Sequence, residues 1–171
     1  MIHEGAQPMK KIRKFDNDAH IFKTSVAEVD IFRASDVMRI LGIEKWRLEK
    51  FLTGKQYKIS PSGRLGKGQG SWRLFSHTDL YRLAVASQMV QDGFTAKFIS
   101  SVLQEIEDSD LIDIDSSGDV CTTDLGVFRS PEGPVVLPLH AHEKWDPYYV
   151  LKLTDLVRAI DKQIQEGKRR K

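Results

Sequence analysis

A glycine-rich stretch over residues 60–71 constrains the fold more than any other feature of the chain. It contains four glycines and lies between two short β-like flanks, residues 57–59 and 72–75. Glycines between flanks rich in aromatic and β-branched residues are typical of a hairpin with a long loop. We therefore predict a β-hairpin with a flexible tip. Its basic residues, Arg64, Lys67 and Arg73, are candidates for contact with a polyanion.

Two short helices are predicted before this hairpin. From Ala34 the apolar residues share one helical face, and Gly42 supplies a stop that tolerates positive φ. A second helix follows from Glu44 to about Leu52, with Leu48, Phe51 and Leu52 inward and Lys45, Arg47, Glu49 and Lys50 outward. Two short helices joined in this way predict a helix-turn-helix, whose second helix can enter the major groove of DNA.

Two further helices are predicted directly after the hairpin. Ser76 is the expected N-cap of the first, with Asp79 in its first turn and Gly93 after its end. Thr95 is the expected N-cap of the second. Their apolar positions predict core residues without a chemical role: Leu80, Leu83, Ala84, Met89, Val90, Phe98, Ile99, Val102, Leu103 and Ile106.

The rest of the chain predicts short strands and then a terminal helix. Residues 111–139 alternate apolar and polar positions around a turn at 130–134, which indicates two to four strands. Asp146 as N-cap and Pro147 at the first position predict the start of the last helix. Its apolar seam favours a dimeric coiled coil or packing on the chain's own domain. The seam residues are Val150, Leu153, Val157, Ile160 and Ile164.

The expected fold class is mainly α with small β elements: a winged helix-turn-helix, two supporting helices, a β-rich segment and a C-terminal helix. The expected organisation is a mobile basic arm (1–31), a DNA-binding domain (32–108), a short β-rich segment (109–145) and a C-terminal helix with a basic tail (146–171). The helix of 146–171 is also the candidate dimerisation element.

Charge is sorted along the sequence rather than mixed. Residues 33–75 hold ten Lys and Arg against three acidic residues, a formal charge of +7. Residues 76–126 hold two basic residues against ten acidic ones, a formal charge of −8. A polyanion would approach the first segment and avoid the second, so double-stranded DNA is the expected partner.

The run from Phe32 to Ile106 resembles the MerR family of bacterial transcription regulators. The stretches that carry the resemblance are ASDVMRILGI, EKWRLEKF, SWRLFSHTDLYRL and QDGFTAKFISSVL, in the family's order and spacing. The resemblance implies a transcription regulator that forms a homodimer, with RNA polymerase as a further partner. It also implies that Arg73 is the hairpin arginine that contacts the DNA backbone.

The same resemblance assigns the outward side of the second helix, Lys45, Trp46, Arg47 and Lys50, to the groove. Trp46 is the secondary candidate there, because a Trp beside an amphipathic helix face more often belongs to a core or an interface. We expect Arg47 to read guanine. The family usually carries Arg where this chain has Glu49, which either discriminates against wrong sites or pairs with Arg33 or Arg39.

Enzyme and metal hypotheses find little support in the sequence. The glycine-rich stretch is not a P-loop, because Gly68 rather than Ser or Thr follows Lys67. The one candidate metal motif is His140-Ala-His142-Glu143, and the single Cys121 cannot form an internal disulfide. We expect no catalytic activity, no cofactor and no metal.

Two alternatives to a sequence-specific regulator stay open. One is an architectural or excisionase-like DNA-binding factor, and the other is a protein-binding adaptor that has lost affinity for DNA. No stretch approaches the ~18 consecutive apolar residues of a membrane helix, and the first residues lack the apolar segment of a signal peptide. A cytoplasmic location is therefore expected.

Overall fold

The computed structural model describes residues 30–53, 56–57, 59–65, 72–111, 113–114, 120–121, 123–139 and 146–169. Of the expected N-terminal arm, only Asp30 and Ile31 fall within these ranges. The helices are α1 (Ala34–Leu41), α2 (Lys45–Thr53), α3 (His77–Gln91), α4 (Ala96–Glu105), α5 (Asp108–Leu111) and α6 (Leu153–Arg169). The strands are β1 (Phe32–Arg33), β2 (Gly63–Leu65), β3 (Trp72–Phe75), β4 (Asp113–Ile114), β5 (Val120–Cys121), β6 (Leu125–Ser130), β7 (Gly133–Pro138) and β8 (Tyr149–Leu151).

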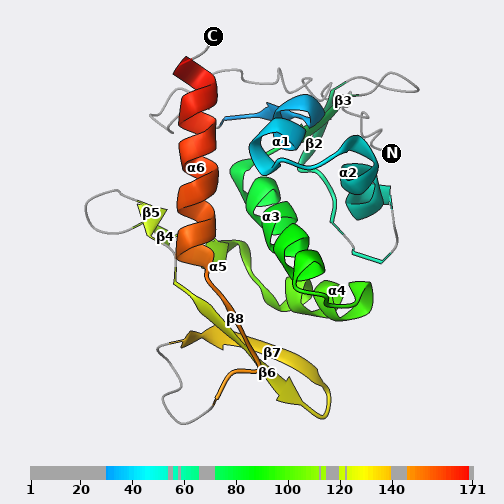
Figure 1. Cartoon of the computed structure of the whole chain (residues 1–171), viewed down its shortest axis with the longest axis vertical. Coiled ribbons are helices and arrows are strands. Elements are labelled where there is room, and N and C mark those ends of the chain that lie inside the picture. Colours follow the sequence, from blue (N-terminus) through cyan, green and yellow to red (C-terminus); the bar gives the residue numbers. More distant parts are fainter. Residues whose placement is uncertain are drawn as a thin grey trace, which may run out of the picture.

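The arrangement is mainly helical with small antiparallel sheets. Figure 1 shows α1, α2 and the sheet of β1–β3 at one end of the molecule and the sheet of β6–β8 at the other. Helix α3 lies between the two ends and packs against both α4 and α6. No helix in the described part of the chain has the length and apolar character needed to cross a bilayer.

The predicted pair of short helices is confirmed. Helix α1 ends at Gly42, whose φ of +61° is the left-handed conformation that ends many helices. Helix α2 begins three residues later and buries Leu48 and Phe51, while Leu52 is half-buried. The inward side of α2 is therefore fixed in the core, and this determines which of its side chains face outward.

The hairpin is confirmed, but its first strand was predicted at the wrong place. Tyr57 and Ile59 are buried core residues outside any strand, and Tyr57 packs edge-on against Phe51 with 5.0 Å between ring centroids. The strand that pairs with β3 is β2, six residues later, in an antiparallel register that places Arg64 opposite Arg73. A short strand that the sequence did not indicate, β1, pairs with the other edge of β3.

Both predicted caps after the hairpin are confirmed. The Ser76 hydroxyl accepts the amide of Asp79 at 3.2 Å, and the Asp79 carboxylate accepts the amide of Ser76 at 2.9 Å. The Thr95 side chain caps α4 by accepting the amide of Phe98. These bonds satisfy amides that the first turn of a helix leaves without partners, and those of Ser76 and Asp79 are reciprocal.

The terminal helix begins later than Asp146 and Pro147 indicated. Residues 149–151 form β8, which pairs antiparallel with β6, so Val150 belongs to a sheet rather than to the helical seam. Helix α6 starts at Leu153, and the carboxylate of Asp124 accepts the amide of Thr154 at 3.1 Å. A cap supplied from thirty residues away thus replaces the local cap that the sequence suggested.

The apolar seam of α6 packs on the chain's own domain. Helix α6 contacts α3 and α1, and its seam joins a single core cluster that runs from Phe32 to Ile164. The buried seam residues are Leu153, Val157, Ile160 and Ile164. At the other end of the fold the turn of the β6–β7 hairpin falls within the predicted segment 130–134, with Gly133 at a φ of +142°.

Candidate nucleic-acid interface

The outward side of α2 carries exposed basic and aromatic side chains. Lys45 and Lys50 are exposed, and Trp46 has 57% of its surface accessible, although it is a large apolar residue. Arg47 is half-buried and so less exposed than Lys45, Trp46 and Lys50. The burial of Leu48 and Phe51 holds the four predicted groove residues outside the core.

Trp46 is held by two residues close to it in sequence, Glu44 and Arg47. Its indole nitrogen donates a hydrogen bond to the carboxylate of Glu44. The guanidinium of Arg47 lies over its ring, 5.4 Å from the centroid. This cation–π contact means that Arg47, the residue predicted to read guanine, rests on Trp46 in the absence of DNA.

Arg73 does not stand free on the hairpin. Its Nη1 atom donates to both carboxylate oxygens of Glu49, at 2.9 and 2.8 Å, and so links β3 to α2. The Glu49 side chain is 42% exposed and that of Arg73 is 28% exposed. The alternative partners expected for Glu49 were Arg33 and Arg39, and that expectation was wrong.

The other two arginines have different contacts. Arg33 lies over the ring of Trp72, 4.9 Å from its centroid, on the face of the sheet opposite Arg73. Arg39 pairs with Asp36 in its own helix, and its guanidinium lies against Gly167 near the end of α6. Both arginines are therefore already in contact with elements that hold them away from Glu49.

The structure gives less information on the other two basic residues of the hairpin, Arg64 and Lys67. The backbone of Arg64 lies opposite Arg73 in the β2–β3 register, and Lys67 falls outside the described residues. The hairpin strands therefore bring the backbone positions of Arg64 and Arg73 together, next to α2.

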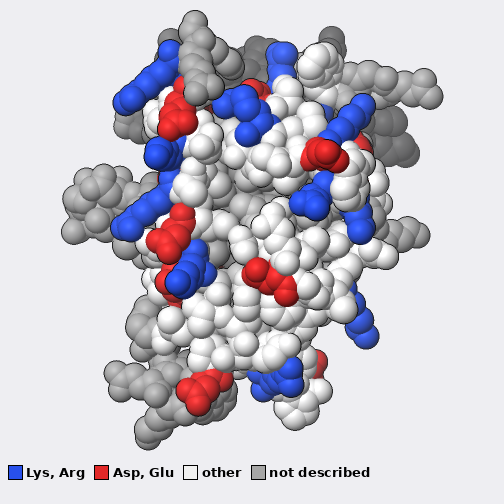
Figure 2. All heavy atoms as spheres, in the orientation of Figure 1, with Lys and Arg blue, Asp and Glu red and all other residues white. Residues whose placement is uncertain are grey.

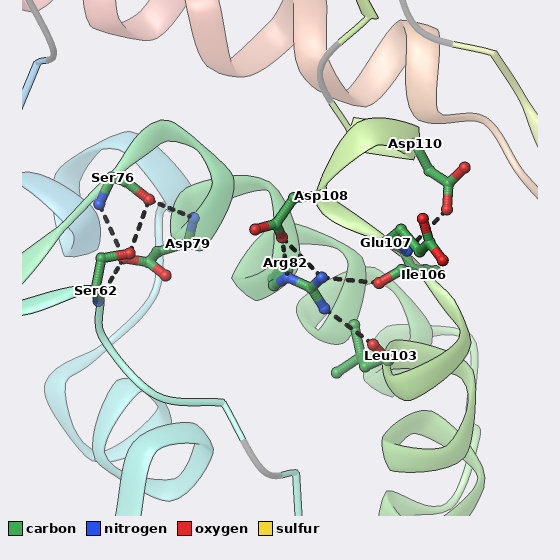
Figure 3. A network of polar contacts seen from close by, with 9 residues as sticks. All are labelled: Ser62, Ser76, Asp79, Arg82, Leu103, Ile106, Glu107, Asp108 and Asp110. Atoms are coloured by element: carbon green, nitrogen blue, oxygen red, sulfur yellow. Dashed lines mark hydrogen bonds and ion pairs between the residues drawn. The ribbon is translucent and has the colours of Figure 1, made fainter.

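A polar cluster fixes the base of the hairpin on α3 (Figure 3). The carboxylate of Asp79, which is buried, accepts the amide of Ser62 at 2.9 Å as well as that of Ser76. The hydroxyls of Ser62 and Ser76 are 3.1 Å apart and form a hydrogen bond. The capping residue of α3 therefore also sets where β2 begins.

A second cluster on α3 fixes the end of α4 (Figure 3). The guanidinium of Arg82 donates to the carbonyl oxygens of Leu103 at 2.9 Å and Ile106 at 2.7 Å, and it also pairs with Asp108. Carbonyls at a helix C-terminus have no partners within the helix, and Arg82 supplies them. Helix α3 is thus the scaffold from which both the hairpin and α4 are positioned.

Basic side chains gather over α2 on the face of the molecule in Figure 2, at the upper right, with one acidic group among them. Along the opposite edge, over α6, basic and acidic residues alternate. Several of the acids in the −8 segment are used by the fold: Asp79 caps α3, Asp108 pairs with Arg82, and Asp92 accepts the hydroxyl of Tyr149.

The described residues contain no group of three or more His, Cys, Asp or Glu side chains placed to hold a metal ion. His140, His142 and Glu143, the candidate metal ligands of the sequence, lie outside the described residues. A cavity of about 480 Å³ is lined by α3, β8 and the start of α6, and another of about 370 Å³ lies at the base of the hairpin. Neither cavity is lined by α2.

A scan against protein-family models and a search of the curated proteins both find no match to this chain.

Proposed function

We propose that this protein binds double-stranded DNA in a sequence-specific manner and regulates transcription. The observation that supports this most is the exposed face of α2, where Lys45, Trp46 and Lys50 lie beside a hairpin that carries Arg73. In this proposal α1, α2 and the β1–β3 sheet act as a winged helix-turn-helix, and α2 is the recognition helix.

The basic residues on this surface would have different roles, because DNA offers both phosphates and base edges. Lysines release counterions when they meet phosphates, so Lys45 and Lys50 would supply affinity without distinguishing bases. Arg47 can donate two parallel hydrogen bonds to guanine, which would give sequence choice. For this the guanidinium must leave the ring of Trp46, and Trp46 then presents its own face to a sugar or a base.

The family proposed is the MerR family, with a homodimer and RNA polymerase as partners. The apolar seam of α6 is buried on α3 and α1, so a homodimer would form through another surface. Two regulator copies on DNA would place two α2 helices in successive turns of the major groove, about 34–36 Å apart.

The test is fluorescence anisotropy of the purified protein with two labelled duplexes, at two salt concentrations. One duplex is the DNA upstream of the protein's own coding sequence, and the other is a scrambled version. We expect tight binding to the first alone, weakened by salt. Equal weak binding to both would favour an architectural factor, and no binding at low salt would favour a protein adaptor.

A further inference from the structure

The ion pair between Glu49 and Arg73 joins the two elements that carry the proposed DNA-binding surface. Glu49 lies on α2 and Arg73 on β3, twenty-four positions apart, with contacts of 2.8 and 2.9 Å. We propose that Glu49 is a specificity-determining residue, an inference that rests on the proposed function. Glu49 suppresses binding to DNA of the wrong sequence, because its ion pair keeps Arg73 from the phosphates of that DNA.

The geometry of the pair leaves part of Arg73 available. Only the Nη1 atom of its guanidinium bonds to Glu49, and among the described residues its Nη2 and Nε atoms have no hydrogen-bond partner. A guanidinium has five N–H groups in a fixed fork, so one edge can hold a carboxylate while the other donates to a phosphate. A phosphate that approaches the free edge can therefore bind Arg73 while the ion pair with Glu49 stays intact. A phosphate that approaches the other edge must break the pair.

The charge of the pair opposes loose association. Arg73 paired with Glu49 contributes no net positive charge, and Glu49 places a half-exposed carboxylate beside the exposed Lys45 and Lys50. DNA that docks in a poor register brings a phosphate near this carboxylate and meets repulsion. DNA that docks in the correct register brings its phosphate to the free edge of Arg73. Specificity is a difference between two affinities, and an element that repels the wrong partner increases it.

The alternative is that the ion pair has a structural role alone and holds the hairpin against α2. In that case, loss of the pair should weaken binding to every duplex, because the hairpin moves. The proposed role predicts tighter binding to non-specific DNA when the pair is lost. The two alternatives therefore predict opposite changes in the affinity for a scrambled duplex.

The test compares Glu49→Gln with wild-type protein in anisotropy titrations of a preferred duplex and a scrambled duplex at several salt concentrations. We expect Glu49→Gln to bind the scrambled duplex about fivefold or more tightly. The plot of log affinity against log salt should steepen by ~0.9, the value for one added phosphate contact. The ratio of affinities for the two duplexes should fall.

Two further variants complete the design. In an Arg73→Gln background, Glu49→Gln should raise affinity and steepen the salt dependence less than it does in the wild-type background, because only the repulsion by Glu49 is removed and no cation is released. Glu105→Gln removes the same charge from the exposed end of α4 and should leave the salt slope unchanged. If Glu49→Gln binds both duplexes more weakly than wild type, or equally well, this inference is wrong. The proposed function still stands in that case, provided that the wild-type protein binds the preferred duplex. Wild-type protein that binds neither duplex overturns both.

Discussion

The carboxylate of Asp79 accepts the backbone amide of Ser62 at 2.9 Å, and this one bond ties the start of the hairpin to the N-terminus of the central helix. The same carboxylate accepts the amide of Ser76 within the capping box. A single buried side chain therefore satisfies two amides from segments fourteen residues apart. The position of the start of the hairpin on α3 is held by this side chain.

We predict that Asp79→Ala lowers the free energy of unfolding by about 2 kcal/mol, because it leaves two part-buried amides without acceptors and removes a cap. Urea denaturation monitored by circular dichroism measures this. Ser62→Ala is the matched control, since it removes only a hydroxyl at an exposed position and keeps the amide bond. Its cost should stay within about 0.5 kcal/mol, and equal costs for the two variants would contradict this role of Asp79.

Arg82 should stabilise the fold through carbonyl oxygens rather than through its ion pair. We predict that Arg82→Ala lowers stability by about 2 kcal/mol, or roughly 4–8 °C in melting temperature. Asp108→Asn should cost less than about 0.5 kcal/mol, because the Asp108 side chain is 74% exposed and solvent screens the pair. If thermal unfolding ranked these variants in the opposite order, the carbonyl contacts would not be what matters.

Tyr81 links α3 to α6, since its hydroxyl donates to Asp161 at 2.8 Å. Burial raises the pKa of Tyr81 above its ordinary value, and the hydrogen bond and charge of Asp161 raise it further. The folded protein therefore keeps a proton that the unfolded chain releases above pH ~10. The stabilisation is fully present below that pH and is lost as pH rises toward the folded pKa.

Accordingly, Tyr81→Phe should cost about 1 kcal/mol at pH 8, and the difference from wild type should shrink above pH ~10. Urea midpoints measured from pH 8 to 11 test this. A difference that stays constant across the range would mean that the Tyr81 hydroxyl ionises alike in both states.

Arg47 is the residue on which sequence choice is proposed to depend. We predict that Arg47→Ala flattens the preference among duplexes that differ at one guanine, a discrimination of about 1–3 kcal/mol. Arg73→Ala should instead weaken binding to every duplex of this single-base set similarly, because these duplexes dock in the same register. A set of single-base variants of the preferred duplex, ranked by competition, measures both effects. An unchanged ranking for Arg47→Ala would show that α2 does not read bases through this side chain.

Local signals in the sequence predicted local structure well. Gly42 ended α1, and Ser76 and Thr95 capped the next two helices, because each acts on amides or carbonyls within a few residues. The same locality explains why the turn between β6 and β7 was predicted correctly at residues 130–134.

Features set by distant residues could not be predicted in this way. The start of β2 depends on Asp79, seventeen residues from Ser62, and the start of α6 depends on Asp124, thirty residues from Thr154. Asp146 and Pro147 gave a good local helix start, but pairing of residues 149–151 with β6 overrode it. The Glu49–Arg73 pair was missed for the same reason, although Glu49 itself stood out among basic neighbours.

The most direct test of the central claim removes the two exposed lysines of α2 and compares the result with an equal loss of charge elsewhere. The Lys45→Ala/Lys50→Ala variant is measured against Lys97→Ala/Lys152→Ala, whose lysines are exposed on α4 and before α6. Anisotropy titrations with the preferred duplex at several salt concentrations should show that the α2 variant binds at least about tenfold more weakly. Its salt slope should be shallower by ~1.8, while the control binds like wild type. Equal losses in the two variants, or none in either, would contradict a DNA-binding surface on α2.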